Sequence, residues 1–280
     1  MSENWTTVIE PKRKWYNIGL KELIKYKDLI FLFVKRDFST LYKQTILGPL
    51  WILINPFLTT VFFTLVFGRI ANISTNSIPQ FLFYMCGNVL WGFFSRTLTK
   101  NSSLYLSNAG LLKKVYFPRL SLAVTSNITS FINFLLQLAM FLGFLFYFII
   151  IKSPVKPNIY ILAVPVLLFI CSMLATGTGL IITAVTTKYR DLSVLTSFGV
   201  QLWFYITPIV YPLSAVPTNM RKFFLLNPMT SVMEAFRYAF LGSGSFSFKN
   251  LLASAAISFV ILLAGLFTFA RSERNFSDII

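Results

Sequence analysis

Residues 187–192 read Thr-Lys-Tyr-Arg-Asp-Leu, a short charged segment between two long apolar runs. The runs on either side, residues 159–187 and 193–220, contain no Asp, Glu, Lys or Arg. A charged side chain at the centre of a bilayer costs about 2.5–3.5 kcal/mol on insertion scales, so this segment belongs at a water interface. The pattern predicts two membrane-spanning helices, joined by a corner that a partner outside the membrane can contact.

The composition of the whole chain indicates an integral membrane protein. Its 280 residues are 56% hydrophobic and 12% charged, whereas a soluble domain carries about 25% charged residues. The apolar runs are far longer than the roughly 9–11 residues of a membrane β-strand, so we expect an all-α membrane protein. The net charge of +16 does not indicate nucleic acid, because basic residues of membrane proteins gather on the cytoplasmic side and meet anionic lipid there.

Hydropathy divides the chain into three parts. Residues 1–45 are expected to form a cytoplasmic tail and an amphipathic helix (18–43) that lies along the membrane surface. Residues 46–270 form a single transmembrane domain, and residues 271–280 form a second cytoplasmic tail. We place both termini inside, because that orientation leaves most loop Lys and Arg residues in the cytoplasm. The six expected membrane spans are 46–67, 79–98, 120–151, 159–187, 193–211 and 251–270.

Residues 213–241 are expected to form a re-entrant hairpin that enters the outer leaflet and returns. Closely spaced prolines end the helix of the fifth span. Asn227-Pro228 then predicts an N-cap followed by proline at the first helical position, and Gly242 ends this helix. The helix would be about 20 Å long at 1.5 Å per residue, which is too short to cross a bilayer. Such a segment must pack against protein or line a cavity.

The sequence lacks the groups that most enzymes and nucleotide-binding proteins need. Histidine is absent, and none of the 13 glycines is followed by Lys, which excludes the phosphate-binding motif G-x-x-x-x-G-K-[ST]. We therefore expect no catalytic residue, metal site or cofactor in this chain. The spans carry almost no ionisable residues for ion or proton coupling. A stand-alone channel or secondary carrier is thus a less favoured alternative to a transporter powered by a partner.

Two groups of polar residues are candidates for transport roles. Ser130, Asn133 and Gln137 share one helical face, with Asn127 near it, and either form interhelical hydrogen bonds or line a polar conduit. Glu234 and Arg237 are three residues apart, and either neutralise each other as a local ion pair or form an outer gate. The candidate pathway residues are Trp51, Asn55, Asn127, Ser130, Asn133 and Gln137, and the candidate gate residues are Tyr211, Glu234, Arg237 and Tyr238.

Four segments of the chain, in a fixed order, carry a resemblance to a known family. They are Val34-Lys35-Arg36-Asp37 through Leu47-Gly48-Pro49-Leu50-Trp51, Leu112-Lys113-Lys114-Val115-Tyr116-Phe117-Pro118-Arg119, Lys188-Tyr189-Arg190-Asp191-Leu192, and Leu226-Asn227-Pro228. Together they resemble the permease subunits of polysaccharide-exporting ABC transporters, the O-antigen, capsule and teichoic-acid group of type-2 permeases. The resemblance spans about residues 18–275. It implies a bacterial cytoplasmic-membrane protein that exports a polysaccharide linked to polyprenyl diphosphate. A type-2 permease for a drug or a lipid is the alternative.

The resemblance also implies partners. The permease would form a homodimer with two separate nucleotide-binding ABC ATPase subunits, which would bind ATP and Mg²⁺. The corner 188–192 and the loop 111–119 would contact those subunits. In the sequence itself, Arg36-Asp37 ahead of the first span echoes Arg190-Asp191 ahead of the fifth; this is either a chance likeness or a sign that both segments face the same cytoplasmic partner. The candidate coupling residues are Arg36, Asp37, Lys113, Lys114, Tyr116, Phe117, Arg119, Lys188, Tyr189, Arg190 and Asp191.

Overall fold

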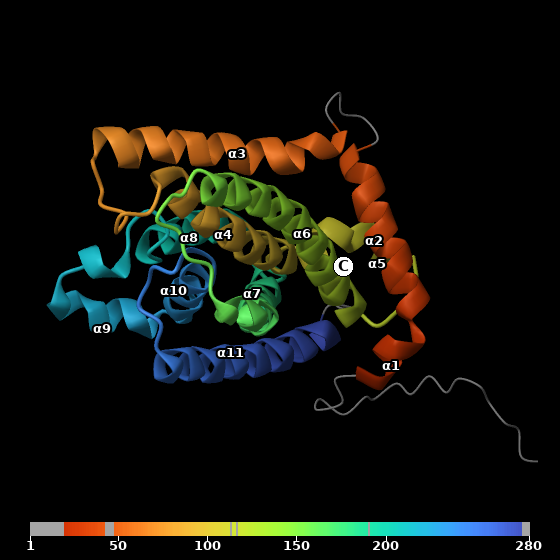
Figure 1. Ribbon diagram of the computed structural model, residues 1–280. Helices are drawn as coiled ribbons and strands as arrows, with labels where there is room; N and C mark the ends of the chain where they lie inside the picture. The colour runs from red at the N-terminus through yellow and green to blue at the C-terminus, as the bar shows by residue number, and fades with distance from the viewer. Residues whose placement is uncertain (1–19, 43–47, 113, 116, 190, 276–280) are drawn as a thin grey trace, which may run out of the picture.

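The computed structural model describes residues 20–42, 48–112, 114–115, 117–189 and 191–275, and all regular secondary structure in these ranges is helical. Most of the helices form a bundle, and α1 and α2 run across one end of it (Figure 1). The α-helices are α1 (Leu20–Lys25), α2 (Lys27–Tyr42), α3 (Trp51–Phe63), α4 (Gln80–Ser102), α5 (Leu104–Leu112), α6 (Leu120–Ile150), α7 (Val164–Thr186), α8 (Leu192–Ile206), α9 (Thr218–Leu226), α10 (Pro228–Leu241) and α11 (Phe248–Asn275).

Four helical segments of the described chain are long and apolar enough to cross a membrane. They correspond to the expected first, third, fourth and sixth spans, with boundaries that differ by a few residues. The segment Gly48–Ile70 combines α3 with the helical turns on either side of it. The segment Ile159–Thr186 begins with a helical turn that precedes α7. Helix α8 is apolar but shorter. The four segments are Gly48–Ile70, Leu120–Ile150, Ile159–Thr186 and Phe248–Ser272.

Helix α4 occupies the position of the expected second span and forms the centre of the fold. It packs against α3, α6, α7, α8 and α10, which bury nearly all of its sides. Large side chains such as Phe83, Tyr84 and Phe94 are almost completely buried. Helix α4 also carries buried polar groups, such as Asn88, which donates to the Thr60 hydroxyl at 3.2 Å. Because protein surrounds α4, it can carry polar groups that a lipid-facing helix could not.

Small residues let α7 and α11 approach closely. A Cβ added to Gly177 would lie 2.6 Å from the Cα of Leu262, and a Cβ added to Gly265 would overlap the carbonyl oxygen of Gly177. Lipid chains are as apolar as the side chains, so helices in a membrane associate largely through close packing of this kind. The pair α7–α11 therefore forms one compact side of the bundle beside α4 (Figure 1).

The expected single helix over 18–43 is instead two helices within the described residues, α1 and α2, which meet at a turn at Tyr26. Helix α2 buries Phe33 and Val34 against the bundle, and Phe33 packs edge-on against Phe117 with ring centroids 5.4 Å apart. It also leaves Phe31 71% exposed. The turn separates α1 from the part of the segment that is tied to the bundle.

Helix α8 ends at Ile206, five residues before the predicted end of the fifth span at Tyr211. The next residue, Thr207, is extended (φ −87°, ψ 134°), because a residue that precedes proline is disfavoured in the helical conformation. The N-cap predicted at Asn227 is confirmed: its side chain accepts a hydrogen bond from the Met229 amide at 3.1 Å. Gly242 ends α10 in the left-handed conformation (φ 71°), as the sequence predicted.

Candidate functional site

The end of the bundle where α2 lies brings together segments that are far apart in the sequence. A small core at this end joins α2, α5, α6, α7 and α11 through buried side chains. The last residues of α7 and α4 also meet, because the Thr186 hydroxyl donates to the Ser102 carbonyl at 3.4 Å. Two of the predicted coupling segments, Arg36-Asp37 and the loop that contains Phe117, join at this core. The members of the core are Phe33, Leu104, Tyr105, Phe117, Leu122, Ala123, Leu180 and Phe269.

The corner between α7 and α8 projects from this end. Lys188, Tyr189 and Asp191 are exposed, and Tyr189 keeps 52% of its surface accessible. The Lys188 ammonium lies 5.2 Å from the ring centroid of Tyr189. Arg190 lies outside the described residues. The exposed corner is therefore accessible to a protein partner, as the alternation of apolar and charged sequence predicts.

The loop between α5 and α6 contains both exposed and buried candidates. Lys114 is exposed, whereas Phe117 is 4% exposed and packs beneath α2. The Arg119 guanidinium lies 5.7 Å from the ring centroid of Tyr105. Lys113 and Tyr116 lie outside the described residues. Phe117 thus anchors the loop to α2, while Lys114 faces the solvent.

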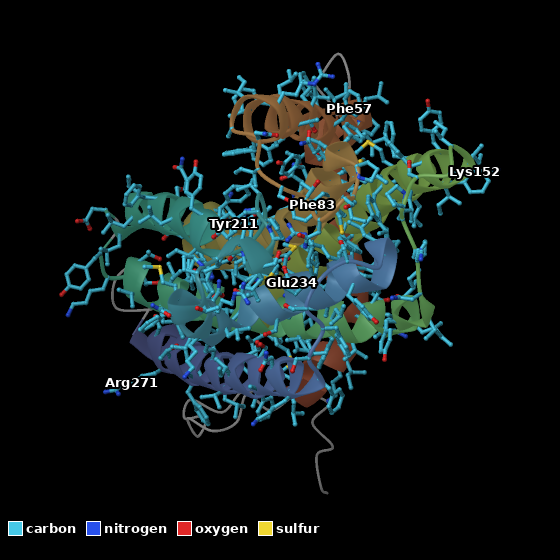
Figure 2. All side chains as sticks on the ribbon, turned by 60° about the vertical axis from the view of Figure 1, so that its left-hand side comes forward. Phe57, Phe83, Lys152, Tyr211, Glu234 and Arg271 are labelled. Carbon is cyan, nitrogen blue, oxygen red and sulfur yellow. The ribbon has the colours of Figure 1, made fainter. Side chains whose placement is uncertain are left out.

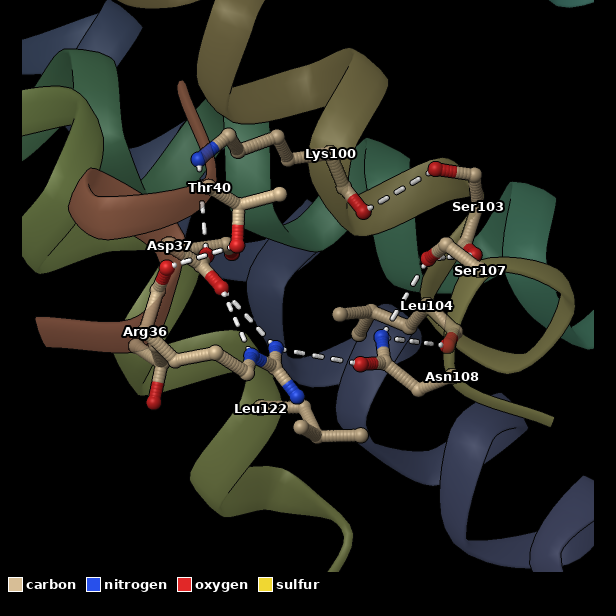
Figure 3. Close-up of a pocket in the computed structure, with 11 residues that line it drawn as sticks. Arg36, Asp37, Thr40, Lys100, Ser103, Leu104, Ser107, Asn108 and Leu122 are labelled. Atoms are coloured by element: carbon tan, nitrogen blue, oxygen red, sulfur yellow. Dashed lines mark hydrogen bonds and ion pairs between the residues drawn. The ribbon is translucent and has the colours of Figure 1, made fainter. Parts of the chain in front are cut away.

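Arg36 and Asp37 line a cavity between α2, α4, α5 and α6, which we call the inner pocket (Figure 3). Arg36 pairs with Asp37 at 2.8 Å and donates to the Asn108 amide oxygen at 3.3 Å. The Lys100 ammonium lies 3.6 Å from the other Asp37 oxygen. Lys100 lies in the last turn of α4. The cavity volume is about 410 Å³.

Lys100 and Asn108 were not predicted from the sequence as partners of Arg36 and Asp37. Both residues are polar and lie near the predicted inner end of the second span or just after it. Only that position pointed to a role at the inner end of the bundle. The contact of Arg36 with Asn108 joins residues 72 positions apart and depends on how α2 packs against the bundle. Their contacts join α2 to α4 and α5.

The polar side chains of α6 do not share one environment with Trp51 and Asn55. The Asn127 oxygen accepts hydrogen bonds from α7, at 2.7 Å from Ser172 and 3.0 Å from Thr176. Gln137 donates to the backbone of α3 at 3.2 Å. Asn127 and Gln137 are thus interhelical hydrogen-bonding groups, the first of the two interpretations that the sequence left open. Trp51 and Asn55 are exposed on α3.

Ser130, Asn133 and Gln137 are buried on the α6 face predicted to carry them. The Asn133 amide donates to the Thr129 carbonyl one turn earlier, at 3.0 Å. Within the described part of the chain, the Ser130 hydroxyl oxygen and the amide oxygens of Asn133 and Gln137 have no hydrogen-bond partner. These three atoms are buried, unsatisfied polar groups along one face of α6.

Glu234 and Arg237 form a local ion pair, one of the two interpretations that the sequence left open, and the pair is almost completely buried. The Arg237 guanidinium lies 3.5 Å from the Glu234 carboxylate and 3.9 Å from the ring centroid of Phe83. It also donates to the carbonyl of Ile209, and to that of Tyr211 at 3.4 Å. Figure 2 shows Glu234 and Phe83 inside the molecule, away from Lys152 and Arg271 at its periphery. The pair therefore ties α10 to α4 and to the chain after α8.

The two candidate gate tyrosines have different surroundings. The Tyr211 hydroxyl donates to the Tyr205 carbonyl at 2.6 Å. Tyr238 instead packs against Tyr160 and Phe246, with centroid distances of 5.4 and 5.6 Å. The four gate candidates are therefore joined only through α10 and the Tyr211 backbone, and their side chains do not form one cluster.

A family profile described as "ABC-2 type transporter" matches residues 28–241, most of the chain. The chain belongs to the ABC-2 type transporter family. This membership confirms the type-2 ABC permease that the sequence segments indicated.

Relatives of known annotation match almost the full length of this ABC-2 family member. An O-antigen export system permease protein RfbA from Myxococcus xanthus is 29% identical over 262 residues, which cover 92% of this chain and 98% of the relative. A protein of the same name from Klebsiella pneumoniae is 24% identical and covers 95% and 98%. The capsule polysaccharide export inner-membrane protein CtrC of Neisseria meningitidis is 25% identical and covers 91% and 95%.

Proposed function

We propose that this chain is the transmembrane subunit of an ABC transporter that exports a lipid-linked polysaccharide of the O-antigen type across the bacterial cytoplasmic membrane. The observation that carries the proposal is the match over 98% of the length of two O-antigen export permeases. The absence of a Gly-Lys phosphate-binding motif from the sequence supports separate ATPase subunits as the source of energy. Those subunits would bind ATP and Mg²⁺.

The proposed membrane arrangement has six spans with both termini in the cytoplasm. The four apolar helical segments are four of these spans. The enclosed helix α4 would be the second span along the chain, and α8 would be the fifth. Helices α9 and α10 form the proposed outward re-entrant hairpin, and the buried Glu234–Arg237 pair packs the hairpin against protein, as backbone at membrane depth requires. The basic residues at the end that carries α2 support its assignment to the cytoplasm.

The ATPase subunits would contact the permease at the exposed corner of Lys188, Tyr189 and Asp191, together with the loop at Lys114. Phe117 and Arg36 would transmit movement of that loop to α2, since Phe117 packs on α2 and Arg36 bonds to α5. A second permease copy would cover the outward apolar faces of α3 and α8, because α8 has no buried residue in the single chain. The proposed complex therefore contains two permeases and two ATPases.

Co-expression of a tagged chain with candidate ABC ATPase subunits from the same organism tests the proposal. We expect an ATPase to co-purify in a complex of two copies of each subunit, and we expect the pair to restore surface polysaccharide in a strain that lacks the permease. Asp191→Ala is expected to abolish most export while the complex still assembles and hydrolyses ATP. Lys249→Ala, which changes an exposed residue in the first turn of α11, is the control. Polysaccharide export by the permease without any ATPase would refute the proposal.

A further inference from the structure

The inner pocket holds more positive than negative charge among the described residues that line it. Arg36 and Lys100 both contact one carboxylate, that of Asp37. Two cations that share one carboxylate keep a net positive charge, which an anion in the cavity would neutralise.

The two cationic groups of the cavity suit an oxyanion. The Asn108 amide oxygen accepts a hydrogen bond from Arg36, and the Ser103 and Ser107 hydroxyls donate to backbone carbonyls, so Arg36 and Lys100 are the donors available to a ligand (Figure 3). Phosphate oxygens accept hydrogen bonds from guanidinium and ammonium groups, and charge-assisted bonds of this type are the strongest. A volume of about 410 Å³ falls within the range of small-ligand pockets. A neutral sugar would leave the extra positive charge uncompensated.

The cationic side chains remain accessible from outside the protein. The side chains of Arg36 and Lys100 are 42% and 30% exposed, so a ligand can reach both. Helix α2 contributes Arg36 to the pocket and also exposes Phe31 and Leu32, 71% and 60% respectively. A helix with apolar and basic exposed residues lies in the interface between headgroups and acyl chains. The pocket therefore opens at the depth where a lipid carries its phosphate groups.

We propose that the inner pocket binds the phosphate head of an isoprenoid-linked substrate, between Arg36 and Lys100, before the substrate crosses the membrane. This inference rests on the proposed function, because it assigns a recognition site to the lipid carrier of the exported polymer. Asp37 would oppose binding, because its carboxylate competes with the phosphate for Arg36 and Lys100. Removal of its charge should therefore strengthen binding.

The test measures binding of farnesyl diphosphate, a soluble isoprenoid diphosphate, to the full-length permease–ATPase complex in phosphatidylcholine nanodiscs. Lys100→Gln is expected to weaken binding about tenfold or more, because a charge-assisted hydrogen bond is lost. Lys100→Arg should bind within a few-fold of the unmodified chain, and Asp37→Asn should bind more tightly. Lys249→Gln, an exposed lysine far from the pocket, is the control.

Three further probes identify the source of the phosphate. Farnesol, inorganic diphosphate and nanodiscs with added phosphatidylglycerol represent the lipid chain alone, a free anion and an ordinary lipid headgroup. Weaker binding of farnesol and inorganic diphosphate, with little competition from phosphatidylglycerol, supports the proposal. Equal binding of inorganic diphosphate, or full displacement by phosphatidylglycerol, overturns it.

The variants also separate this inference from a purely structural ion pair and from the proposed function. If the Lys100–Asp37 pair is purely structural, Lys100→Gln and Asp37→Asn should both lower the melting temperature, and neither should change the affinity for farnesyl diphosphate. That result overturns the phosphate site even if the complex exports polysaccharide normally. Affinity changes of opposite sign support the site. If these affinity changes are found but the unmodified complex exports no polysaccharide, the proposed function fails and the site remains.

Discussion

The buried Glu234–Arg237 pair yields a prediction whose size follows from its surroundings. Glu234→Gln keeps the shape of the side chain and removes its charge. Arg237 is 1% exposed, so its guanidinium would remain charged inside the protein without a counter-ion. Loss of one partner from a buried pair costs about 3–5 kcal/mol, because the other charge stays uncompensated.

The expected loss lies at the lower end of that range. Arg237 would still donate to the carbonyls of Ile209 and Tyr211, and would still lie 3.9 Å from the ring centroid of Phe83. The new amide could still accept a hydrogen bond from the Ser245 backbone, which now donates to Glu234 at 2.9 Å. We therefore expect a loss of about 3 kcal/mol. At roughly 2–4 °C per kcal/mol, this is a fall of roughly 6–12 °C in melting temperature.

Thermal unfolding of the detergent-purified chain, followed by intrinsic fluorescence, measures this change. Asp28→Asn, which removes an exposed carboxylate from α2, is the control and should shift the melting temperature by less than about 2 °C. The double variant Glu234→Gln/Arg237→Met leaves no buried charge and should recover much of the stability. An unchanged melting temperature for Glu234→Gln, or a double variant less stable than either single variant, would refute the reasoning.

Two further predictions concern helix packing, and melting temperature checks both. Gly177→Leu should destabilise the chain much more than Gly143→Leu, because the backbone of α11 lies against Gly177, whereas nothing lies within 4 Å of a Cβ at Gly143; equal losses would contradict this packing. Asn127→Leu should cost roughly 1 kcal/mol, because it removes two hydrogen bonds from α7 worth about 0.6 kcal/mol each on average. The control Asn55→Leu changes an exposed residue of α3 and should leave the melting temperature nearly unchanged.

Local features of the sequence were sufficient to predict most of the helices. Long apolar runs predicted the four spans, because burial in lipid requires an uninterrupted apolar helix. Asn227-Pro228 and Gly242 predicted the two ends of α10, because caps depend on neighbouring backbone groups. The end of α8 was misplaced by five residues, although the conformational effect of Pro208 on Thr207 is also local. The order of short segments indicated the family that the profile match then confirmed.

Only the tertiary structure decided which of these helices are enclosed and which polar groups meet. Helix α4 has polar residues and a modest apolar pattern, yet it is the centre of the fold, because five other helices supply its surroundings. Arg36, Lys100 and Asn108 meet at the inner pocket through the packing of α2 against the end of the bundle. Hydropathy and capping act over a few residues of chain, whereas these contacts depend on side chains brought together from distant helices.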